Sequence, residues 1–324
     1  MKFKKWIKRI GIGILSLIVL LMLSGFIYEQ IGRYKSKKIV AERTGSLVDV
    51  GEHKLYYEQK GNGDVTVIFE SGSPGDHRPW KFLSDTISKY ATTITYDRAG
   101  LLWSERGPYP KNASNASKDL ETLLKKINAP KPYILVGHSA GGVFPRPFIT
   151  KHEKDFLGVI FIDPSNPNQF KNAPQEIKEV NQMPFFFKRG IFSFINEIGV
   201  PRLIFDDPLI FNSIKKGGAF DEMDYFMEEM PNEKSVFPDK PWNVPLLVIS
   251  AGNLDSAPGA DDPELKKKIK EYWKSLQIEN SQLSSQGKRI VAEKSDHNML
   301  YSERNLITSE IIKMIQLKDS LIID

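Results

Sequence analysis

The chain has no cysteine among its 324 residues. This absence excludes disulfide bonds, thiolate nucleophiles, cysteine-ligated zinc and iron–sulfur clusters. It also excludes a lipidated cysteine as a membrane anchor. Any reactive site must therefore be built from other residue types.

Outside the N-terminal segment the chain has no net positive charge. The chain has 45 Lys and Arg against 40 Asp and Glu, a formal net charge of +5. Residues 1–38 hold nine of the basic residues and one acid, Glu29, so the remaining chain is slightly acidic. Nucleic-acid binding needs clustered positive charge on the folded body. We therefore expect no nucleic-acid partner.

The N-terminal segment also contains a run of 19 residues without a charge, Ile10–Tyr28. A helix of that length is about 28 Å long, close to the hydrocarbon thickness of a bilayer. The basic residues before the run favour a cytoplasmic N-terminus and an exported body. A cleaved signal peptide, giving a secreted protein, and a buried core helix are the alternatives, but no Ala-x-Ala-like cleavage site follows the run. The pattern predicts a single-pass anchor that contacts the bilayer through residues 10–28.

The rest of the chain alternates short apolar or β-branched runs with amphipathic stretches. Residues 47–57 predict a β-hairpin around Gly51-Glu52. Further strands are predicted at 65–70, 91–96, 133–136, 158–162, 245–250 and 289–292, and helices at 80–89, 117–128 and 305–317. This alternation predicts an α/β fold with a mostly parallel sheet and helices on both faces.

Residues 164–243 interrupt the alternation. They contain no strand-like run and are rich in aromatic residues and methionine. Because a structureless loop of that length is uncommon in a compact domain, we expect a helical cap, whose apolar side chains form its own core or line a substrate pocket. The predicted organisation is an anchor with basic flanks at 1–38, a core at 39–163 and 244–324, and the cap.

The pentapeptide Gly137-His138-Ser139-Ala140-Gly141 follows a predicted buried strand and precedes a predicted helix. This G-x-S-x-G pattern is typical of a sharp turn that presents a nucleophilic serine at the carboxyl end of a strand. The flanking positions must be nearly free of side chains, and both are glycine. The pentapeptide alone is weak evidence, but its position after a buried strand makes Ser139 the predicted nucleophile.

A serine hydroxyl needs a general base, which a carboxylate must orient. Of the five histidines, His297 follows the last predicted strand, which places it at the same sheet edge as Ser139. His297 is therefore the predicted base. Two acids are open: Asp255, after the strand at 245–250, is preferred, and Asp163, directly after the strand at 158–162, is the alternative.

Acyl transfer also needs two backbone N–H groups that stabilise an oxyanion. Ala140, directly after the predicted nucleophile, is expected to supply one. The loop Ser71–Gly75 is expected to supply the other, with Ser73 as the preferred donor. The alternative for this loop is a plain turn.

Several of these segments together resemble the α/β-hydrolase superfamily, from about residue 47 to the C-terminal end. The matching segments are VDVGEHKLYYEQKG, ESGSPG, YDRAG, VGHSAGG, GVIFIDPS, SAGNLD and SDHN. The set is similar to the capped esterase and prolyl-aminopeptidase-like branch. The resemblance implies that Asp97-Arg98 braces loops near the site, and the order Ser…Asp…His fits either acid.

The chain departs from such relatives in two places. Ser71 stands where they usually have histidine. Pro145 and Pro147 should kink or shorten the helix after the serine.

The sequence thus predicts a membrane-anchored serine hydrolase that cleaves a small-molecule ester, with no metal and no organic cofactor. An aminopeptidase acting on short peptides is an alternative, which needs acids such as Glu228-Glu229 or Asp221-Glu222 to hold the substrate ammonium. Such acids are more typical of a solvated helix face. A non-catalytic ligand sensor on the same fold is a further alternative. Epoxide or halide chemistry is disfavoured because its nucleophile would normally be Asp.

Overall fold

The computed structural model describes residues 2–41, 43–108, 110–180, 189–204 and 217–321. The chain divides into two compact units. The first consists of Met1–Arg43 with Met183–Lys215, and the second of Thr44–Gln182 with Lys216–Asp324. The second unit contains the sheet and every predicted site residue.

The sheet has eight strands in the order β1-β2-β4-β3-β5-β6-β7-β8. β1 and β2 form the predicted hairpin, and β2 is antiparallel to β4. The remaining strands, β4, β3, β5, β6, β7 and β8 in sheet order, run parallel to one another. The prediction of a mostly parallel sheet is confirmed. The strands are β1 (Ser46–Asp49), β2 (Lys54–Lys60), β3 (Thr66–Glu70), β4 (Thr92–Tyr96), β5 (Tyr133–His138), β6 (Phe156–Ile162), β7 (Leu246–Ala251) and β8 (Gly287–Ala292).

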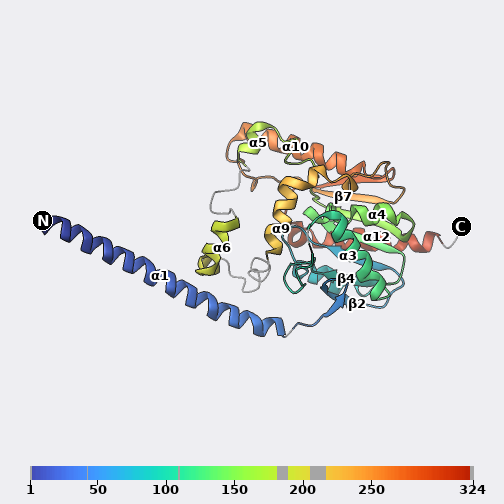
Figure 1. Ribbon diagram of the computed structural model, residues 1–324. Helices are drawn as coiled ribbons and strands as arrows, with labels where there is room; N and C mark the ends of the chain where they lie inside the picture. The colour runs from blue at the N-terminus through green and yellow to red at the C-terminus, as the bar shows by residue number, and fades with distance from the viewer. Residues whose placement is uncertain (1, 42, 109, 181–188, 205–216, 322–324) are drawn as a thin grey trace. The chain divides into compact units, whose positions relative to one another are not determined.

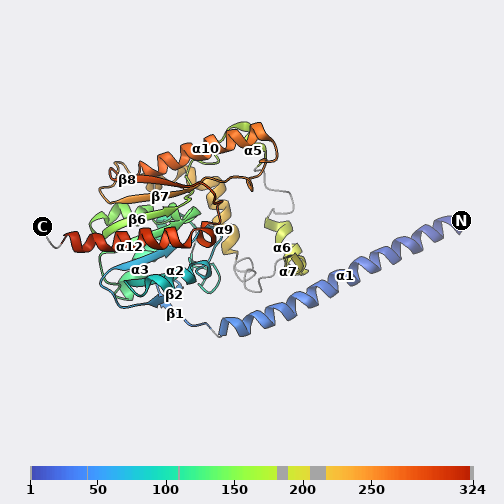
Figure 2. The ribbon, with the colours of Figure 1, turned by 180° about the vertical axis from the view of Figure 1, so that it is seen from behind.

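Helices cover both faces of the sheet (Figures 1 and 2). Side chains alternate between the faces along each strand, so Ile68 of β3 packs with one helical layer and its neighbours Val67 and Phe69 pack with the other. Burial on both faces explains why the inner strands are continuous apolar runs. One layer contains α3 (Ala113–Lys126) and α4 (Arg146–Lys151), and the other contains α2 (Lys81–Ile87) and α12 (Arg304–Leu321).

A 19-residue helix at the β7–β8 side, α10 (Pro263–Ser281), is absent from the sequence-based prediction. It begins at an N-cap, Asp262, whose carboxylate accepts hydrogen bonds from the amides of Glu264 at 2.9 Å and Leu265 at 3.2 Å. The apolar residues of the helix recur at helical spacing, so a signal for it was present in the sequence. This helix matters because several of its polar side chains, among them Trp273, Gln277 and Asn280, bond to the loop after β6.

Between β6 and β7 the described residues are mainly helical. α6 and α7 belong to the first unit, whereas α5 and α9 belong to the second. The division into one core and one cap therefore stays a prediction. The helices are α5 (Gln175–Val180), α6 (Arg189–Glu197), α7 (Val200–Ile204) and α9 (Gly218–Asp224). A short π-helix (Tyr225–Glu229) and two 3-10 helices (Met230–Asn232 and Lys234–Val236) follow. Met183, Phe185, Phe186, Phe187, Phe205 and Phe211, part of the predicted aromatic cap, lie outside the described residues.

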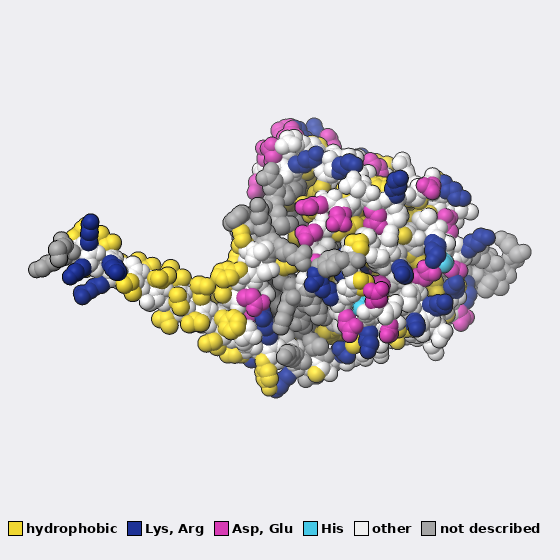
Figure 3. All heavy atoms as spheres, viewed as in Figure 1, with side chains coloured by type: hydrophobic (Ala, Val, Ile, Leu, Met, Phe, Trp, Pro, Cys, Tyr) yellow, Lys and Arg dark blue, Asp and Glu magenta, His cyan; other side chains and the backbone are white. Residues whose placement is uncertain are grey.

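The first unit contains the helix α1 (Lys2–Ala41). Within it, Phe3–Ser36 is long and apolar enough to cross a membrane, and none of its most apolar window is buried inside the protein. The reading as a buried core helix is therefore wrong. Figure 3 shows the exposed apolar side chains along this helix and basic side chains at its N-terminal end. Both membrane anchors and signal sequences share this length and composition.

Candidate active site

Ser139 lies at a tight turn between β5 and a short 3-10 helix, Ser139–Gly142. Its φ of 55° is in the left-handed region, which residues with a side chain rarely adopt. A Cβ at Gly137 would lie 2.1 Å from the carbonyl oxygen of Gly141, and a Cβ at Gly141 would lie 2.3 Å from that of Glu70. The predicted need for residues without side chains on both sides of Ser139 is confirmed.

The prolines after the turn shorten the following helix, as predicted. The 3-10 helix stops at Gly142, and α4 begins only at Arg146. The Arg146 side chain is buried and donates hydrogen bonds to the carbonyl oxygen of Gly142 at 2.7 Å and to Asn280 Oδ1 of α10 at 2.9 Å. Because it is buried, its pKa is lowered to about 9. Arg146 thus ties the turn to α10.

His297 contacts Asp163, the alternative acid. His297 Nδ1 lies 2.7 Å from Asp163 Oδ2. Asp163 directly follows β6 and is 1% exposed, and its Oδ1 accepts hydrogen bonds from the Ala251 amide at 3.0 Å and from Trp273 Nε1 of α10 at 2.9 Å. Burial by itself would raise the pKa of Asp163, but the hydrogen bond and charge of His297 outweigh it, and the pKa is lowered.

Asp255, the preferred acid in the sequence, does not occupy this place. It is exposed, and its Oδ1 pairs with Lys266 Nζ at 2.5 Å. Its own amide donates to Asn253 Oδ1 at 2.8 Å, while the Asn253 amide bonds to the carbonyl oxygen of Ser295 at 3.1 Å. The loop after β7 is therefore held beside the loop after β8, with Asp255 at the surface. The expectation that Asp255 pairs with His297 is contradicted by this geometry.

The sheet register explains the difference. His138 of β5 is paired with Ile162 of β6. Ser139 and Asp163 each follow one member of that pair, so both leave the sheet at the same level. Asp255, by contrast, comes several residues after the end of β7.

His297 lies beside the turn that carries Ser139. Its carbonyl oxygen is 2.9 Å from His138 Nε2, and the two imidazole centroids are 4.6 Å apart. Burial, and next the charge of His297, lowers the pKa of His138 to about 4, so its ring is neutral at neutral pH. Among the described residues Ser139 Oγ has no hydrogen bond to His297. Nucleophile–base hydrogen bonds often tighten only when a substrate binds.

The loop predicted to hold the second oxyanion donor lies against Ser139. A Cβ at Gly72 would be 3.0 Å from Ser139 Cβ. The Ser71 hydroxyl donates to the carbonyl oxygen of Asp76 at 2.8 Å and accepts from Trp80 Nε1 at 2.9 Å, which supplies the loop's hydrogen bonding without the usual histidine. In the described part of the chain, the amides of Ala140 and Ser73 donate to no protein acceptor.

A buried arginine, Arg98, forms hydrogen bonds with the backbone of this loop. Arg98 donates to the carbonyl oxygens of Ser71 at 2.6 Å and Gly72 at 2.8 Å, and it pairs with Glu70 at 2.6 Å and Glu222 of α9 at 2.7 Å. Burial alone would lower the pKa of Arg98, but the two carboxylates raise it, so the guanidinium stays charged. Arg98 thus braces the loop, as the resemblance implies.

Glu222 connects α9 to the same loop. One of its carboxylate oxygens, Oε2, accepts a hydrogen bond from the Ser73 hydroxyl at 2.8 Å as well as one from Arg98 at 2.8 Å. Sequence reasoning considered Glu222 only as part of an acidic patch. Its place between Arg98 and Ser73 depends on a contact across 124 residues of chain, which no local pattern reveals.

The acids proposed to hold a substrate ammonium are otherwise engaged or solvated. Asp221 pairs with Arg106 at 3.2 Å, and Glu222 pairs with Arg98. Glu228 and Glu229 are exposed. The described residues of these patches therefore give no support to an aminopeptidase.

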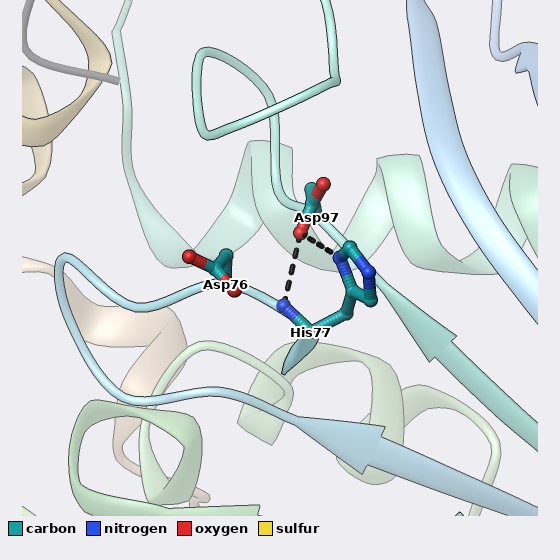
Figure 4. Close-up of side chains that lie close together, drawn as sticks. All are labelled: Asp76, His77 and Asp97. Atoms are coloured by element: carbon teal, nitrogen blue, oxygen red, sulfur yellow. Dashed lines mark hydrogen bonds and ion pairs between the residues drawn. The ribbon is translucent and has the colours of Figure 1, made fainter. Parts of the chain in front are cut away.

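Figure 4 shows Asp76, His77 and Asp97, whose ligand atoms lie close enough together to hold a metal ion. These groups already form hydrogen bonds and ion pairs with one another and with Arg78. Asp97 Oδ1 accepts hydrogen bonds from the His77 amide at 3.0 Å and from His77 Nδ1 at 2.8 Å, and Asp76 pairs with Arg78 at 2.7 Å. Burial would lower the pKa of His77, but Asp97 raises it. The cluster joins the loops after β3 and β4, and we assign it no metal.

Comparison with known proteins defines the class of fold. A family model described as the alpha/beta hydrolase fold matches residues 65–204. With the parallel sheet and the serine turn described above, this shows that the chain has the α/β-hydrolase fold.

The chain also resembles a curated protein over most of its length, and the solved structures that match it agree with this fold. The Bacillus subtilis protein YqjL, described as uncharacterised, is 25% identical over 251 residues, which cover 77% of this chain and 83% of YqjL. The solved structure of epoxide hydrolase CorEH aligns with a TM-score of 0.63 at 13% identity, over 84% of this chain and 98% of that one. An esterase from Exiguobacterium antarcticum aligns with a TM-score of 0.56 at 14% identity, over 84% and 100% of the two chains. At these identities the solved structures establish the fold and leave the reaction open.

Proposed function

We propose that the protein is a serine hydrolase that cleaves a small-molecule ester through an acyl-enzyme. The observation that carries the proposal is the 2.7 Å contact between His297 Nδ1 and the buried carboxylate of Asp163, beside a strained turn centred on Ser139. Sets of serine, histidine and carboxylate are recognised by such geometry and not by sequence position. The esterase among the structural neighbours is compatible with this reaction.

In the proposed reaction Ser139 Oγ attacks the ester carbonyl while His297 Nε2 takes its proton. Asp163 keeps the Nδ1–H of His297 directed toward its own carboxylate and stabilises the imidazolium that forms. The amides of Ala140 and Ser73 donate hydrogen bonds to the oxyanion. His297 then protonates the departing alcohol, and a water molecule activated by His297 releases the acid from Ser139.

Two features favour ester cleavage over the other reactions. The acids needed for an aminopeptidase are paired with arginines or exposed to solvent. The central residue of the turn is serine, whereas epoxide opening normally uses an aspartate nucleophile there. An epoxide hydrolase among the structural neighbours does not change this, because that likeness concerns the fold alone.

We also propose that Ile10–Tyr28 anchors the protein in a membrane, with the N-terminus in the cytoplasm and the hydrolase unit on the other side. The exposed apolar surface of α1 and the basic residues before it support this arrangement. Extraction of membranes with alkaline carbonate tests it: the full chain should stay with the lipid, and release into the supernatant would contradict a retained anchor.

A fluorophosphonate probe tests the serine hydrolase directly, because it reacts with an activated serine. The wild-type chain should be labelled and should hydrolyse a short-chain p-nitrophenyl ester. Ser139→Ala should lose both, whereas Ser309→Ala, at an exposed serine of α12, should keep both. A folded wild type that is not labelled and does not turn over ester would instead support a ligand sensor.

A further inference from the structure

Within the first unit, the segment that joins α6 to α7 packs closely on the C-terminal part of α1. A Cβ at Gly25 would lie 2.2 Å from the carbonyl oxygen of Ile198, and a Cβ at Gly32 would lie 2.2 Å from Arg202 Nε. The two glycines are seven residues apart and therefore share a face of α1. They leave a shallow strip on α1. The backbone of Ile198 fills it at Gly25, and the side chain of Arg202 fills it at Gly32.

Ion pairs on the same face fix this contact. Glu29 is 1% exposed and lies 2.7 Å from Arg202 Nε and 2.9 Å from Arg33 Nε. Arg33 also pairs with Glu197 at 2.7 Å. The cluster holds two acids and two arginines, so it carries no net charge. A buried carboxylate without its partners is strongly unfavourable, so the Glu29–Arg202 contact holds α7 against α1.

The contact lies at a defined height along α1. Glu29 is the first charged residue after the apolar run Ile10–Tyr28. At 1.5 Å per residue, Gly25 lies about 5 Å before the end of that run. If the run spans the hydrocarbon core, the junction of α6 and α7 lies at the boundary between acyl chains and headgroups, where interfacial helices bind.

The two helices carry apolar side chains that the described residues do not cover. Phe194 of α6 is 53% exposed, and Leu203 and Ile204 of α7 are 72% and 70% exposed. Contiguous exposed apolar side chains mark membrane or protein interaction sites, and Leu203 and Ile204 are adjacent in the chain. Here they belong to the same compact unit as an apolar helix whose side chains are exposed from Phe3 to Ile31. Because they share this unit with an exposed apolar helix, we take lipid as the partner.

We propose that α6 and α7 form an interfacial surface that inserts Phe194, Leu203 and Ile204 into the leaflet at the C-terminal end of the α1 span. This inference rests on the proposed anchor. Part of the chain inserted between β6 and β7 is then held at the lipid surface, and Glu29, Arg33, Arg202 and Glu197 fix its depth.

The absence of cysteine allows a direct test with the full chain in phosphatidylcholine vesicles. Leu203→Cys carries an environment-sensitive fluorophore, and Tyr90→Cys, at a 55% exposed aromatic residue of the other unit, is the matched control. The label at position 203 should be quenched by lipids that carry a nitroxide on the acyl chain and protected from iodide. The label at position 90 should be quenched by iodide. A label at position 203 that iodide quenches as strongly as it quenches the control overturns the proposal.

Further variants separate this proposal from those on which it depends. A label on Leu17→Cys reports the anchor: if iodide quenches it, the anchor and this inference both fail. If Leu17→Cys is protected while the label at 203 is in water, only the inference fails. Arg202→Glu should expose the label at 203 to iodide several-fold more, whereas Arg202→Lys should retain most of the protection. Hydrolysis of a soluble ester, measured on the same vesicles, tests the proposed reaction independently.

Discussion

Replacing Asp163 with asparagine is the most direct test of the proposed site. Asn has nearly the shape of Asp and tolerates the left-handed backbone found here, where φ is 40°. The substitution removes the charge that faces His297 Nδ1 at 2.7 Å and lets the side-chain amide donate to that nitrogen. His297 is then held in the tautomer whose Nε2 carries the proton and cannot accept one from Ser139.

The expected loss is large. The equivalent change in a serine protease triad lowers kcat about 10⁴-fold, which corresponds to about 5.5 kcal/mol of lost transition-state stabilisation. Asp255→Asn is the matched control, since it removes only a pair with Lys266 in which the Asp255 side chain is 66% exposed. Surface pairs contribute about 0–1 kcal/mol to stability, so this variant should stay folded. It should then hydrolyse ester within about twofold of the wild type.

The measurement is kcat and KM for a short-chain p-nitrophenyl ester, with thermal unfolding to show that each variant is folded. A folded Asp163→Asn variant within tenfold of wild-type activity would refute the assignment of the acid. So would an Asp255→Asn variant that is the more damaged of the two.

Three further predictions concern the surroundings of the site. Trp273→Phe removes the indole hydrogen bond to Asp163 and should lower the free energy of unfolding by about 2 kcal/mol, measured by urea denaturation; no change would show that this bond is dispensable. Glu222→Gln should lower kcat about tenfold with little effect on KM, because it loosens the loop that carries Ser73 without removing a donor; a change in KM alone would contradict this role. The pKa of His138 is lowered from 6.5 to about 4, so its neutral form contributes stability that is present above pH 6.5 and is lost as the pH falls toward 4; His138→Asn should flatten the unfolding free energy across that window, and an unchanged slope would argue against it.

Much of the fold could be predicted because its signals are local. The strands buried on both faces appear as continuous apolar runs, and the glycines around Ser139 satisfy a steric need within five residues. The shortened helix at Pro145 and Pro147 likewise follows from the chemistry of proline. The helix α10 was also visible in its apolar spacing and its Asp262 cap, and it was missed among its many charged residues.

The choice between the two acids could not be made from neighbouring residues. Asp163 and Asp255 both follow parallel strands, so chain position allowed either one. Trp273 and Ala251, which hold the Asp163 carboxylate, lie 110 and 88 residues away from it. Glu222 likewise reaches Arg98 only through the fold.

The sequence by itself determined the alternation of strands and helices, the serine turn and the apolar N-terminal helix, because each depends on interactions among neighbouring residues. The tertiary structure alone decided which carboxylate meets His297, which carboxylate supports Ser73 and which helices pack on α1. Those outcomes depend on strand register and on the burial of charges that find partners far away in the chain.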